Sequence, residues 1–380
     1  MQGVIERRRA YLQLMRRLTL EKGFFTVQEI QQEAGVPRST AQDWILRLSE
    51  EGCVIVLQPP RGRTPAQYAA TSALPRSACK RIFTSIDGDL VEIVHECMSS
   101  ACAGFCGYHH QLGGGKRMTV VRDGTLLREF IHLGECEVVV GLYPHSAVAV
   151  TGVFLENDQI LQRIRSVGGP AFSLSGMMGL ARGVLGVEIL RDGPCTEGII
   201  RTKALSHLTI GIDNTDSEGG GATFALAIAL LQHLAGFSGV FPITHHVMML
   251  YPDVPEKTAG NSCSAIELAV EPGMIEQIIS ETVRFVSDES VSPSWGVAVR
   301  TGLCISNDLK SFGLSARREV VSCTMARNTA MSSSVILSGG DGVIGALAAV
   351  ALVGLPANLL LDPARDPPGL PFSSDKNSDE

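Results

Sequence analysis

The chain has 380 residues, of which 45% are hydrophobic and 19% are charged, and its formal net charge is −7. This composition is typical of a globular protein of two or three domains and excludes a uniformly basic nucleic-acid coat, although a locally basic module is still possible. The N-terminus carries no secretory signal pattern, so we expect a cytoplasmic protein whose ten cysteines are reduced thiols or metal ligands.

Residues 1–75 are predicted to form a winged helix-turn-helix domain. Apolar periodicity and turn residues predict three helices and then a hairpin, at residues 7–21, 26–35, 39–51, 53–58 and 66–71. Thr26 and Glu29 have the spacing of a capping box, Gly35 is expected to end the second helix, and Ser39 to cap the third. This order of elements is that of a winged helix-turn-helix.

The third helix would be the recognition helix of such a domain. Polar side chains at its start and arginines at the hairpin tip could contact bases or phosphates of DNA or tRNA: Arg38, Ser39, Thr40, Gln42, Arg61 and Arg63. The alternative is a protein-interaction module, because the same helix also carries two glutamates. A homodimer would suit a winged-helix regulator.

Residues 76–205 are expected to form a middle α+β domain. Strands are predicted over residues 118–124 and 137–155, with a turn at 143–146 in the second. Residues 156–169 are predicted to be helical, and residues 173–190 to be a glycine-rich helix or a pair of strands.

The middle region contains a cysteine cluster, "HECMSSACAGFCGYHH". Cys97, Cys102 and Cys106, with Cys136, Cys79 or a histidine as the fourth ligand, could hold an iron–sulfur cluster in a small-residue loop, or a structural Zn²⁺. The alternative is a helix with buried free cysteines, since Cys102 and Cys106 would share one face.

Residues 206–362 are expected to form a C-terminal α/β domain, with a strand at 208–212 and a helix at 223–234. The uncharged stretch 342–361 fits a buried helix that ends near Gly354 and is followed by a short strand better than a membrane span, so we expect no membrane partner. The tail, residues 363–380, is rich in Pro, Ser and Asp and is expected to be disordered.

The loop "IGIDNTDSEGGGAT" joins that strand to that helix. Asp213 and Asp216 could bind a hydrated Mg²⁺, and the following glycines could let backbone amides approach a phosphate. A glycine-rich Asx-turn explains the same residues equally well.

Two later stretches, "YPDVPEKTAGN" and "GVIGALAA", favour the phosphate-site interpretation over the glycine-rich turn. Together with "GIDNTDS…GGAT", in this order, they resemble the kinase-like domain of the archaeal tRNA(Ile) agmatinylcytidine synthetase (TiaS) family over about two-fifths of the chain. The resemblance implies ATP and Mg²⁺ as cofactors and phosphorylation of a wobble cytidine. By matched position it implies catalytic roles for Asp213, Asp216, Thr223 and Lys257, and nucleotide binding by Asn214, Gly220, Gly221, Thr258, Gly260 and Asn261.

The sequence departs from the family pattern in ways that bear on function. Asn214 stands where the family has a second aspartate, and we expect neither the oligonucleotide-binding barrel nor the zinc ribbon with which the family holds tRNA. The main hypothesis is therefore an archaeal DNA-binding regulator that responds to a nucleotide or to redox state. The alternatives are an ATP-dependent enzyme that activates a base of tRNA, and a non-catalytic module of a larger assembly.

Overall fold

The structure is a computed structural model and describes residues 2–62, 64–73, 78–168, 174–254, 257 and 260–363. The chain divides into two compact units, residues Met1–Arg76 and Ser77–Glu380, and each is described by itself. The expected disordered tail lies almost entirely outside the described residues.

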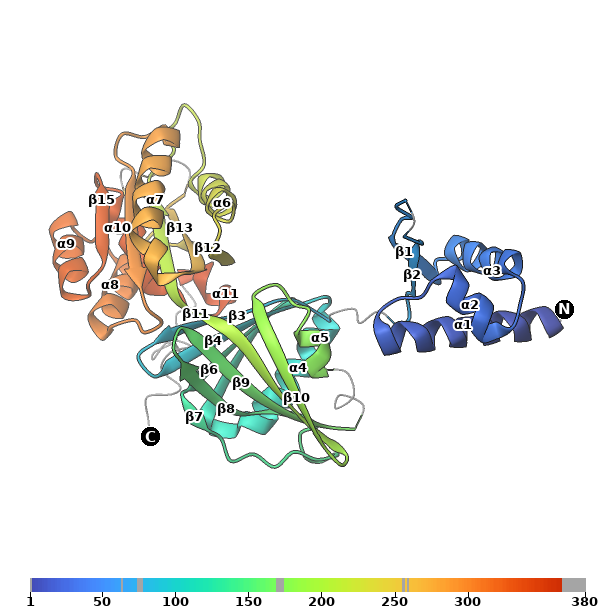
Figure 1. Cartoon of the computed structure of the whole chain (residues 1–380). Coiled ribbons are helices and arrows are strands. Elements are labelled where there is room, and N and C mark those ends of the chain that lie inside the picture. Colours follow the sequence, from blue (N-terminus) through green and yellow to red (C-terminus); the bar gives the residue numbers. More distant parts are fainter. Residues whose placement is uncertain are drawn as a thin grey trace. The chain divides into compact units, whose positions relative to one another are not determined.

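The first unit has the predicted order of three helices and a hairpin (Figure 1). Its elements are α1 (Gln2–Lys22), α2 (Val27–Ala34), α3 (Arg38–Glu50), β1 (Val54–Gln58) and β2 (Gln67–Ala70). The capping box of Thr26 and Glu29 is confirmed, and Gly35 ends α2 in the left-handed conformation with φ 63°. The cap predicted at Ser39 is wrong, because α3 begins one residue earlier, after Pro37, and without a side-chain cap.

The small core of this unit explains its fold. Met15, Phe25, Ile30 and Ile45 are fully buried, one from each helix and one from the segment that joins α1 to α2. β1 and β2 pair antiparallel and extend this core, with Val54 and Ala70 facing it. Burial of these side chains stabilises α2 and α3, which at 8 and 13 residues would be marginal in isolation.

The second unit begins with a four-stranded antiparallel section in the order β5-β6-β4-β3. Its elements are β3 (Cys79–Asp87), β4 (Leu90–Cys97), α4 (Ser100–Gly114), the 3-10 turn η1 (Gly115–Arg117), β5 (Met118–Asp123) and β6 (Leu126–His132). The strand predicted at 118–124 is confirmed. The cysteine-bearing segment predicted as a loop is a helix, α4, which Ser99 caps by accepting a hydrogen bond from the backbone N–H of Cys102.

A further section contains β7 (Gly134–Glu135), β8 (Val148–Glu156), β9 (Gln159–Val167), α5 (Leu174–Met178) and β10 (Val184–Asp192). The helix predicted at 156–169 is wrong: residues 157–167 form the turn and second strand of an antiparallel hairpin with β8. Asn157 makes the turn with φ 56°, and alternating Ile160, Gln162 and Ile164 fill the strand's buried face. The strand predicted from residue 137 begins only at Val148.

Strand β11 (Cys195–Asp213) is 19 residues long and runs through both halves of the second unit. Its first half lies between β9 and β10, and its second half between β13 (Ser262–Val270) and β14 (Gly296–Thr301). The domain boundary expected between residues 205 and 206 therefore falls inside a single strand. This strand makes the whole unit one continuous 13-stranded sheet.

The C-terminal part of that sheet has five strands in the order β12-β13-β11-β14-β15, all paired antiparallel. The remaining elements are α6 (Thr223–Leu234), β12 (Val240–Met249), the 3-10 turn η3 (Pro272–Met274), α7 (Ile275–Glu289), α8 (Asn307–Arg318), α9 (Cys323–Ser332), β15 (Ile336–Gly339), α10 (Val343–Leu352) and α11 (Ala357–Leu360). The strand at 208–212 and the helix at 223–234 are confirmed.

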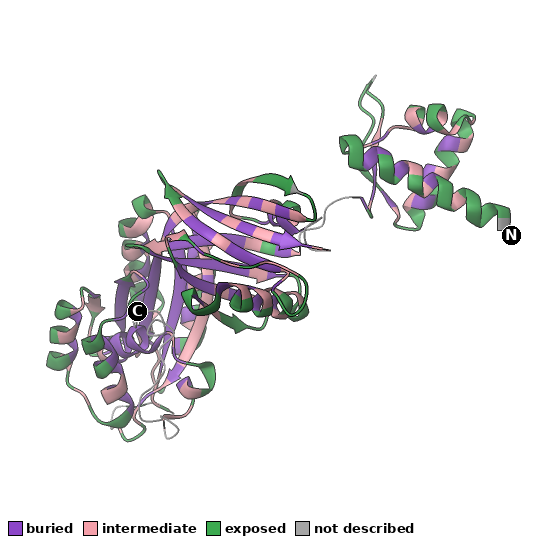
Figure 2. Cartoon of the chain, turned by 90° about the horizontal axis from the view of Figure 1, so that it is seen from below, coloured by how far each residue is buried: buried purple, intermediate pink, exposed green. Residues whose placement is uncertain are grey.

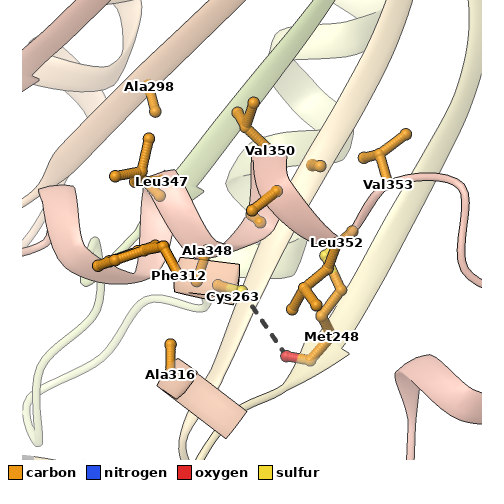
Figure 3. Close-up of a cluster of buried hydrophobic side chains, with 14 of the residues drawn as sticks. Met248, Cys263, Ala298, Phe312, Ala316, Leu347, Ala348, Val350, Leu352 and Val353 are labelled. Atoms are coloured by element: carbon orange, nitrogen blue, oxygen red, sulfur yellow. Dashed lines mark hydrogen bonds between the residues drawn. The ribbon is translucent and has the colours of Figure 1, made fainter. Parts of the chain in front are cut away.

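Helices cover both faces of these five strands, which gives the expected α/β layers (Figure 1). α6 and α7 pack on the face that carries Leu208, Ile210 and Ile212. α10 lies on the other face with α8 and α9, and its Leu347, Val350 and Leu352 are fully buried (Figures 2 and 3). The predicted buried helix is confirmed as α10, of ten residues, but the short strand expected after it is wrong, because Ala357–Leu360 form the helix α11.

Gly211 in the centre of β11 permits this close packing. A Cβ at this position would lie 1.9 Å from the backbone oxygen of Ala346, so α10 can rest directly on the strand only because residue 211 is glycine. No helix in the described ranges has both the length and the apolar character needed to cross a bilayer.

Candidate functional site

The three motifs of the C-terminal region meet at one edge of the five-stranded section. β11 and β12 end at this edge, whereas β13 and β14 begin there, because neighbouring strands are antiparallel. The register fixes the edge, since Asp213 pairs with Gly296 and Met249 pairs with Ser262. The loop after β11, the segment before β13 and the turn before α10 therefore leave the sheet side by side.

Asp213 is the last residue of β11, and its carboxyl group packs against the first turn of α10. A Cβ on Gly345 would lie 1.8 Å from Oδ2 of Asp213, so the carboxyl group fills the space beside this glycine. Burial raises the pKa of Asp213 to about 7, opposed by the backbone N–H of Asn214 and assisted by the charge of Asp216. Asp213 is thus able to exchange a proton near neutral pH.

Thr223, the first residue of α6, is bound to Asp216 through its hydroxyl group. Thr223 Oγ1 donates to Asp216 Oδ1 at 2.9 Å and accepts from the hydroxyl of Thr215 at 3.0 Å. The backbone N–H of Thr215 approaches the same oxygen at 3.3 Å. These bonds join the loop after β11 to the buried first residue of α6.

Asn214 binds the loop before β14. It has φ 56°, a left-handed conformation that asparagine tolerates better than most residues. Its Nδ2 donates to the carbonyl of Ser294 at 3.4 Å, and its Oδ1 accepts from Ser292 Oγ at 3.5 Å. Both ends of the amide therefore hold the polypeptide around the site.

The glycines of the loop form a tight turn. Ser217 and Gly220 exchange backbone hydrogen bonds of 2.9 and 3.1 Å. Gly220 and Gly221 have φ of 146° and 87°, which strongly favour glycine. The glycine-turn interpretation and the phosphate interpretation are compatible, because the turn leads directly to the N-terminus of α6, where Ala222 offers no side-chain cap.

The lysine motif precedes β13. Lys257 is exposed, and its Nζ donates to the carbonyl of Pro252 in the same segment. Asn261 closes this segment by donating to the carbonyl of Tyr251 at 2.8 Å, and Gly260 beside it is exposed. Thr258 lies outside the described residues.

The residues at this edge fit a Mg²⁺ site in which the protein supplies only two carboxylates. Asp213 and Asp216 are close enough for their charges to interact, whereas the described residues contain no group of three or more His, Cys, Asp or Glu side chains arranged to hold a metal. Mg²⁺ in phosphoryl-transfer sites is bound by one or two carboxylates and otherwise by water and phosphate oxygens, so two carboxylates are sufficient. When bound, the ion would neutralise phosphate charge.

The expected metal set of the middle region is not assembled. Cys97 ends β4, Cys102 and Cys106 lie on α4, and Cys136 follows β7, where it lines a separate cavity of about 840 Å³ with Lys116 and Met118. These cysteines are free thiols, as in the alternative interpretation of the sequence. The strand register places Cys97 directly opposite Cys79, one of the side chains considered as the fourth ligand.

Two of the residues expected to contact nucleic acid, Arg38 and Gln42, line a groove in the first unit. Arg38, Gln42 and Gly62 line this cavity of about 660 Å³, together with glutamines of α2. Arg38, Ser39 and Arg61 are exposed, and Thr40 is half-buried. Arg63 lies outside the described residues.

A buried ion network in the second unit was missed from the sequence. Arg128 Nη1 and Nη2 donate to the two carboxylate oxygens of Glu267, each at 2.8 Å, and Arg128 Nε donates to Glu92 at 2.5 Å. His207 and His246 also bind Glu267, at 2.9 and 2.7 Å. Each residue comes from a different strand, and glutamates within otherwise apolar strands were the only local signal.

Comparison with known proteins relates the C-terminal region of the chain to TiaS. Residues 209–336 match the family model described as the TiaS TCKD domain. The isoleucine-tRNA 2-agmatinylcytidine synthetase TiaS of Pyrobaculum neutrophilum is 33% identical over 151 residues, which cover 38% of this chain and 35% of that protein. TiaS of Pyrococcus horikoshii is 29% identical over 40% of this chain and 36% of its own length. The chain thus spans about a third of these TiaS relatives.

A longer match extends beyond this domain. The uncharacterized protein MJ0921 of Methanocaldococcus jannaschii is 28% identical over 284 residues, which cover 72% of this chain and 93% of that protein. Among solved structures, the complex of TiaS with an isoleucine tRNA and ATP is 23% identical with a TM-score of 0.34, over 38% of this chain and 36% of that chain.

Proposed function

We propose that the C-terminal part of this protein is an ATP-dependent phosphoryl-transfer domain that activates a base of a transfer RNA. The observation that carries the proposal is the meeting of three TiaS-like segments at one edge of the sheet, around Asp213, Asp216 and Thr223. The family match over residues 209–336 supports the same assignment. It favours the tRNA-modifying alternative over the DNA-binding regulator that was the main hypothesis from the sequence.

The chemistry assigned to each residue follows from its contacts. Asp216 accepts the proton of the Thr223 hydroxyl, and the uncapped N-terminus of α6 faces the site where phosphate would lie. Asp213 and Asp216 would hold Mg²⁺ beside the phosphates. Lys257 is on an exposed segment at the same edge and could neutralise phosphate charge, provided that it releases the carbonyl of Pro252.

The first unit is assigned to binding of the RNA. Residues 1–76 contain eleven lysines and arginines against seven aspartates and glutamates, although the whole chain has a net charge of −7. Exposed Arg38 and Arg61 lie on the two elements that a winged helix uses on nucleic acids, α3 and the hairpin. This basic unit could supply the electrostatic attraction that the acidic remainder of the chain lacks.

Nucleotide and nucleic-acid binding test the two parts of the proposal separately. Calorimetric titration of the full chain with ATP and Mg²⁺ should give saturable binding, which Asp213→Ala abolishes. Competition between unfractionated tRNA and duplex DNA of matched length should favour tRNA. Absence of ATP binding would refute the assignment of the C-terminal site, and a preference for one duplex DNA sequence would restore the regulator hypothesis.

A further inference from the structure

The groove of the first unit lies between two walls of different character. One wall is α2 with the start of α3, and the other is the hairpin of β1 and β2 (Figure 1). Its volume of about 660 Å³ is that of a site for one small molecule or for one unit of a polymer. The chemistry of the two walls indicates what that unit is.

Four glutamine side chains line the helical wall. Gln28, Gln31 and Gln32 are three or four residues apart on α2 and share one face of that helix, and Gln42 comes from α3. Among the residues that the structure describes, none hydrogen-bonds to these four carboxamides. A carboxamide presents a donor and an acceptor side by side, as does the edge of a nucleobase, so the wall is able to pair with such an edge.

The hairpin wall supplies flat, weakly polar surfaces. Pro60 and Pro65 stand on either side of the hairpin tip, and Tyr68 of β2 stacks on Phe25 with ring centroids 6.0 Å apart. Tyr68 and Phe25 also exchange two backbone hydrogen bonds of 2.8 Å. This wall is therefore fixed before a ligand binds, which lowers the entropic cost of binding. The plane of a base packs well against tyrosine and other flat surfaces.

Arg38 is the one charged side chain among the described residues that line the groove. It is exposed at the first position of α3 and forms no ion pair within the described ranges. A guanidinium in this position is able to bind one phosphate through two parallel hydrogen bonds. The groove thus combines a cation for a phosphate, carboxamides for the edge of a base and flat surfaces for its face.

The rest of α3 is poorly suited to the major groove of a duplex. Asp43 and Glu50 are exposed on this helix, and Arg47 is paired with Asp43 at 2.9 Å. Exposed carboxylates repel the phosphates on either side of such a groove. A base within a duplex is also held between two backbones and cannot enter a concave site, whereas an unpaired base can turn out of its strand.

We propose that this groove binds one unpaired nucleotide of a single-stranded RNA segment, such as a loop or an end. The base packs against Tyr68 and the prolines with its edge toward the glutamines, and its phosphate binds Arg38. The inference deepens the assignment of the first unit to RNA binding, on which it rests. It assigns recognition to an unpaired base in the groove, and not to a duplex that α3 enters.

Fluorescence anisotropy of the full chain tests the groove. The probes are a short fluorescein-labelled RNA without self-complementarity and the same strand annealed to its complement. The duplex has twice the charge, so a preference for the single strand cannot arise from electrostatic attraction alone. We expect the single strand to bind more tightly. The double variant Gln31→Ala/Gln42→Ala should weaken its binding at least about tenfold, the effect of losing one bidentate contact to a base.

Gln13→Ala is the matched control, because Gln13 is exposed on α1 and does not line the groove. Alanine is the better helix former, so the fold should persist in both variants. Equal or tighter binding of the duplex would overturn the proposal, as would a single-strand preference that the double variant retains. ATP titration of the same proteins separates the two proposals. A groove that prefers the single strand in a chain that binds no ATP refutes the proposed function alone. ATP binding without this preference refutes the groove alone.

Discussion

Gly345 and Asp213 share one small space at the edge of the sheet: a Cβ on residue 345 would lie 1.8 Å from Oδ2 of the half-buried aspartate. This relationship joins the first and last of the three TiaS-like segments, because Asp213 and Gly345 are 132 positions apart in the sequence. Gly345→Ala should therefore displace the carboxyl group or α10, at a cost of about 1–3 kcal/mol for overpacking.

The measurement for Gly345→Ala is the unfolding free energy, together with ATP affinity. Gly273→Ala is the matched control, because a Cβ at that position meets nothing within 4 Å. Equal stability and ATP affinity in the two variants would contradict the tight contact between Asp213 and α10.

Stability should depend on pH through Asp213. Its pKa rises from 3.8 in the unfolded chain to about 7 in the folded protein. Because the folded state holds this proton more tightly than the unfolded chain, the stabilisation is fully present below about pH 4 and is lost as the pH rises through 7. The full change in unfolding free energy is roughly 4 kcal/mol by linkage. Asp213→Asn removes this titration.

Denaturant unfolding of the wild type and Asp213→Asn between pH 4.5 and 8.5, without divalent cations, measures this effect. Wild-type stability should fall relative to the variant up to about pH 7 and then run parallel to it. Mg²⁺ should recover stability at pH 8 in the wild type alone. A stability difference that does not change with pH would refute the burial of an ionisable Asp213.

The buried Arg128–Glu267 pair should matter more for stability than an exposed pair does. Burial alone would raise the pKa of Glu267, yet Arg128 and the two histidines hold it well below its usual value. Arg128→Met leaves Glu92 and Glu267 buried without a guanidinium, which should cost about 3–5 kcal/mol. Arg201→Met, which breaks exposed ion pairs with Glu188 and Glu156, should leave the unfolding midpoint almost unchanged.

Sequence patterns predicted those elements whose ends carry local signals. α6 begins at Thr223 after the glycines and ends at Leu234, as predicted, and the capping box of α2 is present. The prediction failed for β9, whose charged and polar residues concealed a two-residue alternation and whose turn signal, Asn157, was missed. Local patterns decide where elements begin, but tertiary packing decides between helix and strand in such segments.

The candidate site was only partly visible in the sequence. Asp213, Asp216 and Thr223 lie within ten residues of each other, so their contacts could be anticipated. The contact of Asp213 with Gly345, and the pairing of Cys79 with Cys97, depend on strand register between distant segments. No local pattern encodes register across such separations.

The first unit should bind tRNA through arginines that are free of ion pairs among the described residues. Arg38→Ala and Arg61→Ala should each weaken binding and reduce the salt dependence of the affinity by about one counterion. Arg47→Ala is the control, because Arg47 is already paired with Asp43 at 2.9 Å. Fluorescence anisotropy at several salt concentrations measures both quantities. An equal loss for Arg47→Ala would contradict a specific binding surface.

ATP turnover in the presence of tRNA tests the proposed function most directly. Phosphate release from ATP and Mg²⁺ is measured for the full chain alone, with unfractionated archaeal tRNA and with single-stranded DNA of similar length. Of the two nucleic acids, we expect only tRNA to stimulate phosphate release. We expect Thr223→Val to reduce this release at least about 100-fold while ATP still binds. Ser238→Ala, at an exposed position beyond the far end of α6, should have wild-type activity. No stimulation by tRNA, or equal turnover in Thr223→Val, would contradict a phosphoryl-transfer enzyme that acts on tRNA.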